Sequence, residues 1–158
     1  MSTHAPASSG HTLAQDARIG IVAARFNLEI VDELLAGCQR RLQQLSVQAD
    51  RIEIHRVPGA FELPLAAKAM AQTKRFAAII CLGAIIRGDT PHFDYVAGEC
   101  ARGIAQVALD QTLPIIFGVL TTNTHEQVIE HIGGRHGHAG ERAAEAAVEM
   151  ASLLARLR

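Results

Sequence analysis

The segment IIRGDTPHFDYV, residues 85–96, brings a glycine, an acid, a threonine, a proline and a histidine to one turn. The apolar run AAIICLGA before it predicts a buried strand, because parallel strands covered on both faces are continuously apolar. Thr90 is the predicted N-cap and Pro91 suits the first helical position, so a helix should begin here. His92 then lies in the first turn of that helix. A strand end, a glycine turn and a helix N-terminus together are typical of an anion or small-molecule site in an α/β protein.

His92 could transfer protons at neutral pH, because imidazole is the side chain that ordinarily titrates there. The positive end of the helix dipole favours the neutral ring, which can accept a proton and return it elsewhere. The backbone N–H groups that follow Gly88 could hold a phosphate. The carboxylate of Asp89 would oppose an anion, so we expect its backbone rather than its side chain to face the ligand.

The elements that must position these residues alternate between strand and helix. We expect strands at 18–24, 51–57, 77–86 and 114–120, helices at 27–45, 61–73, 92–112, 125–132 and 141–158, and a Gly/His loop at 133–140. This alternation predicts a parallel sheet between two layers of helices. Ligands in such folds bind beyond the carboxyl ends of the strands, which here carry ARFN, VPGAFELP, GAIIRGDTPH and GVLTTNTHEQ.

Composition and missing motifs exclude several classes of protein. The net charge is −1, aromatic residues make up 4% and tryptophan is absent, so no nucleic-acid surface is indicated. No apolar stretch approaches the roughly 20 residues of a membrane span. There is no GxGxxG after the first strand, no GxxxxGK[ST] and no GxSxG. Residues 1–17 lack the apolar core of a signal peptide and are expected to form a flexible tail before one domain at 18–158.

Cysteine and histidine usage gives no metal site. Three cysteines without CxxC spacing are expected to be buried reduced thiols in a cytoplasmic protein: Cys38, Cys81 and Cys100. The histidines near the C-terminus match no zinc motif and are expected to belong to a mobile loop over the site: His125, His131, His136 and His138.

Taken in order, the four strand-end segments resemble the 6,7-dimethyl-8-ribityllumazine synthase family, from about residue 18 to the C-terminus. The resemblance implies the penultimate step of riboflavin biosynthesis. In that step 5-amino-6-(D-ribitylamino)uracil condenses with 3,4-dihydroxy-2-butanone 4-phosphate, releasing phosphate and water, with no metal or organic cofactor. The expected fold is a single-domain, three-layer αβα sandwich with a parallel, flavodoxin-like sheet.

The resemblance also assigns residues to the pyrimidine side of the site. Phe26 matches the aromatic that stacks on the pyrimidine. The residues matching the ribityl-binding segment and the strand end beside the uracil are Ala60, Phe61 and Glu62, and Ala84, Ile85 and Ile86. Phe117 matches a residue that reaches the uracil from a neighbouring subunit. The resemblance therefore implies a homo-oligomer built from pentamers, with riboflavin synthase as a candidate further partner.

On the phosphate side, Asp89 and Thr90 match phosphate-binding positions and His92 matches the proton-transfer residue. The chain departs from the family pattern at three places: His131 replaces the usual phosphate-binding arginine, Ala139 a lysine and Arg142 a glutamate. We expect His131 to bind the phosphate, although Arg135 or Arg142 could supply the missing cation.

Two other functions remain open from the sequence. One is a weakly active or non-enzymatic shell that binds lumazine or flavin. The other is the archaeal type of riboflavin synthase on the same scaffold, although that family lacks the full GAFELP and RGDTPHF set in this form.

Overall fold

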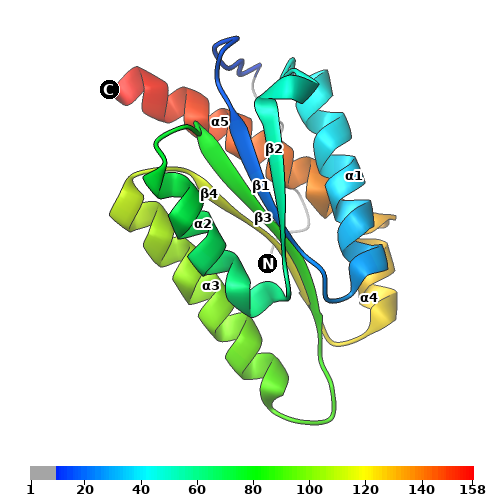
Figure 1. Cartoon of the computed structure of the whole chain (residues 1–158). Helices are drawn as coiled ribbons and strands as arrows, with labels where there is room; N and C mark the ends of the chain where they lie inside the picture. Colours follow the sequence, from blue (N-terminus) through cyan, green and yellow to red (C-terminus); the bar gives the residue numbers. More distant parts are fainter. Residues whose placement is uncertain (1–9) are drawn as a thin grey trace.

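A four-stranded parallel sheet forms the centre of the protein in the computed structural model, which describes residues 10–158 (Figure 1). Its strands lie in the order β2-β1-β3-β4 and are β1 (Ile19–Ala24), β2 (Ile52–Val57), β3 (Ala78–Ile86) and β4 (Ile115–Thr122). Every pair in this sheet is parallel, with Ile21 opposite both Ile54 and Ile80. All four strands therefore end at the same edge, which is the lower edge in Figure 1.

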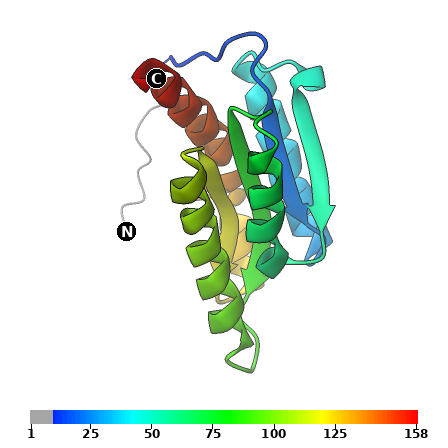
Figure 2. The same ribbon diagram turned by 60° about the vertical axis from the view of Figure 1, so that its left-hand side comes forward.

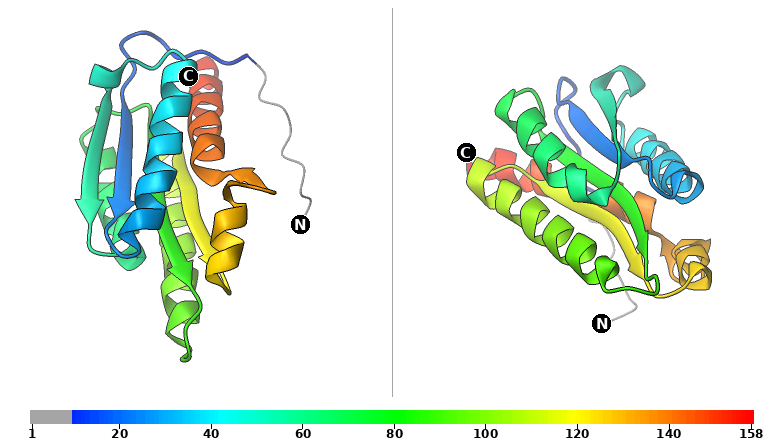
Figure 3. Two further views of the ribbon diagram at one scale, coloured as in Figure 1. Left: turned by 90° about the vertical axis from the view of Figure 1, so that its right-hand side faces the viewer. Right: turned by 60° about the horizontal axis from the view of Figure 1, so that its bottom comes forward.

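Helices cover both faces of the sheet. Those of 10 or more residues are α1 (Leu28–Gln44), α2 (Leu63–Gln72), α3 (His92–Gln111) and α5 (Ala139–Leu157). The helices α2 and α3 pack on one face, and α1 and α5 lie side by side on the other (Figures 2 and 3). The predicted single-domain, three-layer αβα sandwich with a parallel, flavodoxin-like sheet is therefore confirmed.

The two central strands hold the core. Every residue of β1 and the first eight of β3 are buried, as their continuous apolar runs predicted. Successive side chains point to opposite faces, so Ile21 joins the cluster with α1 and α5 whereas Val22 joins the cluster with α2 and α3. The edge strand β2 is mostly exposed and carries charge, including Glu53, whose Oε2 lies 2.7 Å from Arg75 Nη1. Charges of this kind discourage pairing with a further strand.

The segment between the fourth strand and the last helix differs from the prediction. The helix α4 (His125–Glu130) ends two residues earlier than expected. Most of the predicted loop at 133–140 is a small antiparallel hairpin of β5 (Ile132–Gly134) and β6 (Gly137–His138). The helix α5 then starts at residue 139, two residues earlier than predicted. Gly133 and Gly137 have φ of 109° and 73°, values that other residues rarely adopt, and these allow the turn. Periodicity cannot detect strands of two or three residues.

The predicted flexible tail lies partly outside the described residues. Within the described part, Leu13 packs against the cluster beneath α1 and α5. No helix among residues 10–158 is long and apolar enough to cross a membrane.

All three cysteines are buried and unpaired, as predicted. Burial raises the pKa of Cys38 to about 12 and that of Cys100 to about 11, and it raises the pKa of Cys81 further still. Thiols of this kind are poor nucleophiles at neutral pH.

Candidate active site

A cavity of about 620 Å³ lies beyond the carboxyl ends of β1, β2 and β3, the edge turned forward in the right-hand view of Figure 3. Nine residues expected in the site line it: Phe26, Ala60, Phe61, Glu62, Ala84, Ile85, Ile86, Thr90 and His92. These residues come from four separate segments of the chain. The fold thus brings together the pyrimidine and ribityl set except Phe117, the predicted proton-transfer residue and one of the predicted phosphate residues.

The turn between β1 and α1 presents Phe26 to the cavity. Its backbone N–H donates to the Pro58 carbonyl at 3.0 Å, which extends the β1–β2 alignment past the strand ends. The next residue, Asn27, is left-handed at φ 59° and ψ 48°, and its Nδ2 donates to the Ala84 carbonyl at 2.8 Å. Phe26 is consequently held at the cavity mouth with 71% of its surface exposed, which leaves the ring free to stack on a planar ligand.

The segment after β2 supplies a carboxylate. It forms a short 3-10 helix, η2 (Ala60–Glu62), directly before α2. A Cβ at Gly59 would lie 3.3 Å from Glu62 Oε2 and 4.0 Å from the Phe26 Cβ. The backbone of residue 59 therefore lies close to both side chains. Glu62 can accept hydrogen bonds from hydroxyl or N–H groups of a ligand.

The loop between β3 and α3 holds His92 at the other side of the cavity. The helix begins at His92, as the predicted range 92–112 requires, but its N-cap is Pro91 rather than Thr90. Thr90 still assists, because its Oγ1 accepts from the His92 backbone N–H at 3.4 Å. His92 is exposed in the first turn, beside the Gly88 and Thr90 that also line the cavity.

Arg87 ties this loop to its surroundings. Its Nε donates to Asn123 Oδ1 at 2.9 Å and its Nη2 to Asp94 Oδ1 at 3.2 Å, and its guanidinium lies 4.3 Å from the Phe93 ring centroid. The loop is thereby fastened both to the first turn of α3 and to the segment after β4. Arg87 thus uses its Nε and Nη2 within the loop region, and it is not among the residues that line the cavity.

The cavity has a wide apolar surface and few polar groups. Its titratable and hydrogen-bonding side chains are those of Asn27, Glu62, Thr90, His92 and Tyr95. No arginine or lysine of residues 10–158 lines it. The arrangement suits a planar, largely uncharged ligand that carries hydroxyl groups. Among the lining side chains, His92 is able to transfer a proton to or from such a ligand.

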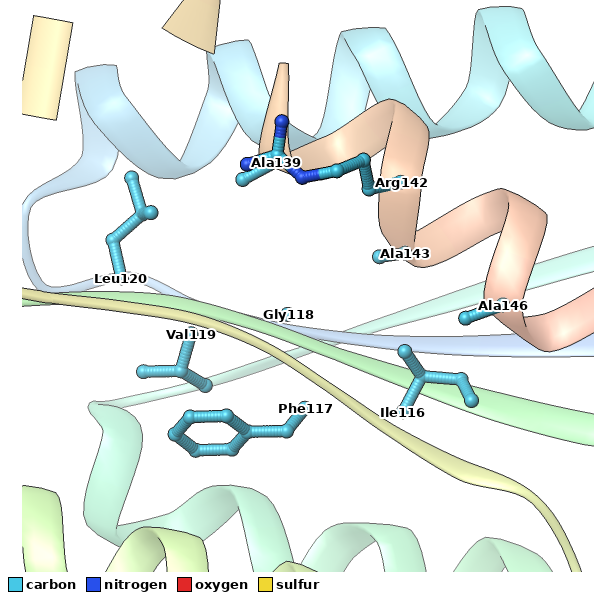
Figure 4. A pocket seen from close by; sticks show the side chains of 9 residues that line it. All are labelled: Ile116, Phe117, Gly118, Val119, Leu120, Ala139, Arg142, Ala143 and Ala146. Carbon is cyan, nitrogen blue, oxygen red and sulfur yellow. The ribbon is translucent and has the colours of Figure 1, made fainter. Parts of the chain in front are cut away.

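Three predicted site residues do not line this cavity. Asp89 lies exposed in the same loop, between two residues that do. Phe117 lies on β4, 43% exposed, where it lines a second pocket of about 290 Å³ between β4 and α5 (Figure 4). His131 is the C-cap of α4, outside both pockets. Within one chain, the fold therefore separates Phe117 and His131 from the other predicted residues.

The imidazole of His131 stacks on His136, with ring centroids 4.8 Å apart. Burial lowers the pKa of His131, and the nearby His136 and Arg142 lower it further against the opposing effect of Glu130. These effects favour the neutral imidazole.

Three lining residues lie in strand-end segments expected at the site but had no role of their own, namely Asn27, Gly59 and Gly88, and three more were not expected from the sequence: Phe93, Tyr95 and Val96. Tyr95 and Val96 follow His92 by three and four positions, so the helical period alone could have placed them on its face. Asn27 could have been found from the tolerance of asparagine for the left-handed conformation at a strand-to-helix turn.

Among residues 10–158, no group of three or more His, Cys, Asp or Glu side chains is arranged to hold a metal ion. Three histidines of the C-terminal segment make other contacts. The rings of His131 and His136 stack on each other, and His138 Nδ1 accepts a hydrogen bond from the Gly140 N–H at 3.1 Å.

A parallel α/β sandwich with an apolar cavity beyond its strand ends defines a flavodoxin-like protein that binds a small molecule. Residues 16–155 match the family described as 6,7-dimethyl-8-ribityllumazine synthase, nearly the whole of the 158-residue chain. The chain belongs to this family of transferases of riboflavin biosynthesis. The resemblance read from the strand-end segments is thus confirmed.

Proposed function

We propose that the protein condenses 5-amino-6-(D-ribitylamino)uracil with 3,4-dihydroxy-2-butanone 4-phosphate to form 6,7-dimethyl-8-ribityllumazine. The observation that carries this proposal is the single cavity lined by nine residues that the family pattern assigns to substrate contacts. Membership of the family supports the same reaction.

The pyrimidine binds against Phe26 and the end of β3. An exposed aromatic ring at the mouth and the apolar strand end around Ile85 give a planar ring two flat surfaces. The ribityl hydroxyls extend toward η2, where Glu62 accepts hydrogen bonds from them.

The reaction forms a Schiff base between the amine and the ketone, releases phosphate and closes a ring, and each of these steps moves protons. His92 lies in the first turn of α3 on the cavity wall, where it accepts a proton at one step and returns it at another. Both substrates are reactive, so holding them in register supplies much of the rate enhancement. Metal and organic cofactors play no part in this proposal.

The phosphate end of the four-carbon substrate lies near Thr90 and the backbone of Gly88 and Asp89. Backbone N–H groups before a helix N-terminus favour an anion, and the same field assists its departure as free phosphate.

The complete site requires a second copy of the chain. Phe117 lies on the edge strand β4, partly exposed and away from the cavity of its own chain, so it is available to a neighbour. We propose a cytoplasmic homo-oligomer built from pentamers, with riboflavin synthase as the enzyme that takes up the product. An active monomer, detected by light scattering coupled to an assay, would contradict this assembly.

Incubation with both substrates while lumazine fluorescence is followed tests the reaction. Rapid formation of lumazine supports the proposal. Lumazine binding without turnover would favour a binding shell, and consumption of added lumazine to give riboflavin would favour the archaeal type of riboflavin synthase.

A further inference from the structure

The substrate cavity contains no cation to balance a phosphate. A phosphate monoester carries a charge of about −1.5 to −2 at neutral pH, and no arginine or lysine of the described residues lines the cavity. The arginine of the loop before α3, Arg87, contacts Asp94, Asn123 and the Phe93 ring. If the proposed reaction is correct, the cation comes from elsewhere.

The segment 131–142 offers three candidates, and two of them are poorly suited. His131 is stacked on His136 and offers no permanent charge. Arg135 points into solvent, with 80% of its side chain exposed, and its Nε lies 3.4 Å from Glu130 Oε2. Its charge is therefore already paired and screened by water.

Arg142 differs from both. Its Nη1 donates to the His136 carbonyl at 2.6 Å, and it forms no ion pair with any carboxylate of residues 10–158. The side chain runs from α5 along the wall of the pocket beside β4 and ends next to Ala139 (Figure 4). The small Ala139 leaves the guanidinium open to the pocket, and its remaining N–H donors have no acceptor there.

Helix stability does not account for this arginine. Arg142 lies one turn into α5, near the positive end of the helix dipole, where a cation is unfavourable. The adjoining edge of β4 has no strand partner in the described sheet, so an external group or a second copy can reach the guanidinium.

We propose that Arg142 binds the phosphate group of the four-carbon substrate, from the pocket between β4 and α5 of a neighbouring copy. This rests on the proposed function, in which sites are shared between copies. Phe117 and Arg142 lie on opposite faces of β4 (Figure 4), and both line the pocket at the free edge of that strand, so a copy that turns this edge toward a neighbouring cavity presents both residues. The planar guanidinium forms two parallel N–H bonds to a phosphate, which a neutral histidine cannot.

The test compares steady-state constants and inorganic phosphate binding for the full chain and its variants. Arg142→Gln retains an amide donor for the His136 carbonyl but removes the charge. We expect it to raise the Michaelis constant for the butanone phosphate and the inhibition constant of inorganic phosphate by about 10- to 100-fold. The Michaelis constant for the pyrimidine should change less than about threefold, and Arg142→Lys should restore part of the phosphate affinity.

Two further variants keep the test decisive. Ala139→Glu leaves Arg142 in place, favours the helix start and provides a carboxylate beside the guanidinium, so it should weaken phosphate binding even if Arg142→Gln fails to fold. Arg135→Ala removes a cation from the same segment and should leave both constants unchanged. Unaltered phosphate constants in Arg142→Gln or Ala139→Glu, or a larger effect of Arg135→Ala, would overturn the assignment.

The two proposals fail in different ways. If wild-type protein forms no lumazine, the proposed reaction is wrong, and direct titration with inorganic phosphate still decides whether Arg142 holds an anion. If wild-type protein is active but the Arg142 variants bind phosphate normally, only the assignment of Arg142 is wrong.

Discussion

Asn27 Nδ2 donates to the backbone carbonyl of Ala84 at 2.8 Å, which ties the turn after β1 to the end of β3 across 57 positions of sequence. This bond joins the segment that presents Phe26 to the end of β3, which also lines the cavity. Asn27 thus adopts the left-handed conformation of the turn and also holds that turn against the end of β3.

Replacement of Asn27 should therefore destabilise the protein and impair pyrimidine binding. Asn27→Ala loses the bond and places alanine in a left-handed conformation, which should cost about 1–3 kcal/mol in urea unfolding. Asn27→Gly tolerates that conformation and isolates the loss of the bond, which should cost about 1 kcal/mol. Equal stability of both variants and wild type, measured at one protein concentration, would show that the bond contributes nothing.

His92→Ala should slow turnover without abolishing it, because the two substrates are still held together when the proton shuttle is lost. We expect kcat to fall by about 10- to 100-fold while both Michaelis constants stay within about threefold. The assay is lumazine formation followed by fluorescence. His55→Ala, on the edge strand β2 and not among the residues that line the cavity, is the matched control. A His92→Ala enzyme as fast as the control would remove His92 from the mechanism.

Much of the fold and of the main cavity could be predicted from the sequence, because both depend on local signals. The apolar run of β3, the glycine turn after it and the helix that follows determine where His92 lies. In a parallel sheet such strand ends must meet at one edge, so Phe26, Glu62 and His92 were expected together and line one cavity.

The contacts of the C-terminal segment could not be predicted, because they join residues through packing rather than through sequence spacing. The His131–His136 stack and the Arg142 bond to the His136 carbonyl depend on the hairpin β5–β6, whose strands are too short to show a period. The position of His138 against α1 depends on the absence of a side chain at Gly37, about 100 residues earlier in the chain.

Two glycines of α3 should respond in opposite ways to the same substitution. A Cβ at Gly103 would lie 2.7 Å from Pro64 Cβ and Cγ, so Gly103→Ala would force α2 and α3 apart and should destabilise the protein by about 1–3 kcal/mol. A Cβ at Gly98 meets nothing within 4 Å, so Gly98→Ala should stabilise the protein by about 0.5–1 kcal/mol through helix propensity. Thermal unfolding of both variants checks the pair, and a destabilised Gly98→Ala would point to a partner covering that face.

The ring of His138 packs inside the folded structure and accepts a hydrogen bond there. Its Nδ1 accepts from the Gly140 N–H at the start of α5, and its ring packs against Gly37 of α1. Burial lowers the pKa of His138, and Arg40 and Arg142 add to this effect while Glu141 and Glu33 oppose it. Protonation would remove the acceptor and place a cation at the positive end of the helix.

The sign of the pH dependence follows from this lowered pKa. Above about pH 6.5 the histidine is neutral in both the folded and the unfolded chain, so it imposes no penalty. As the pH falls further, the unfolded chain takes up a proton first, and stability decreases until the folded pKa is passed. His138→Asn retains an oxygen acceptor for the Gly140 N–H but cannot titrate, so its midpoint of thermal unfolding should fall less than that of wild type between about pH 7.5 and 5.5. The difference between the two proteins at about pH 8, where histidine is neutral, measures the lost packing and is subtracted from the comparison. If both proteins lose stability in parallel over this range, His138 is not the group that makes the folded state sensitive to acid.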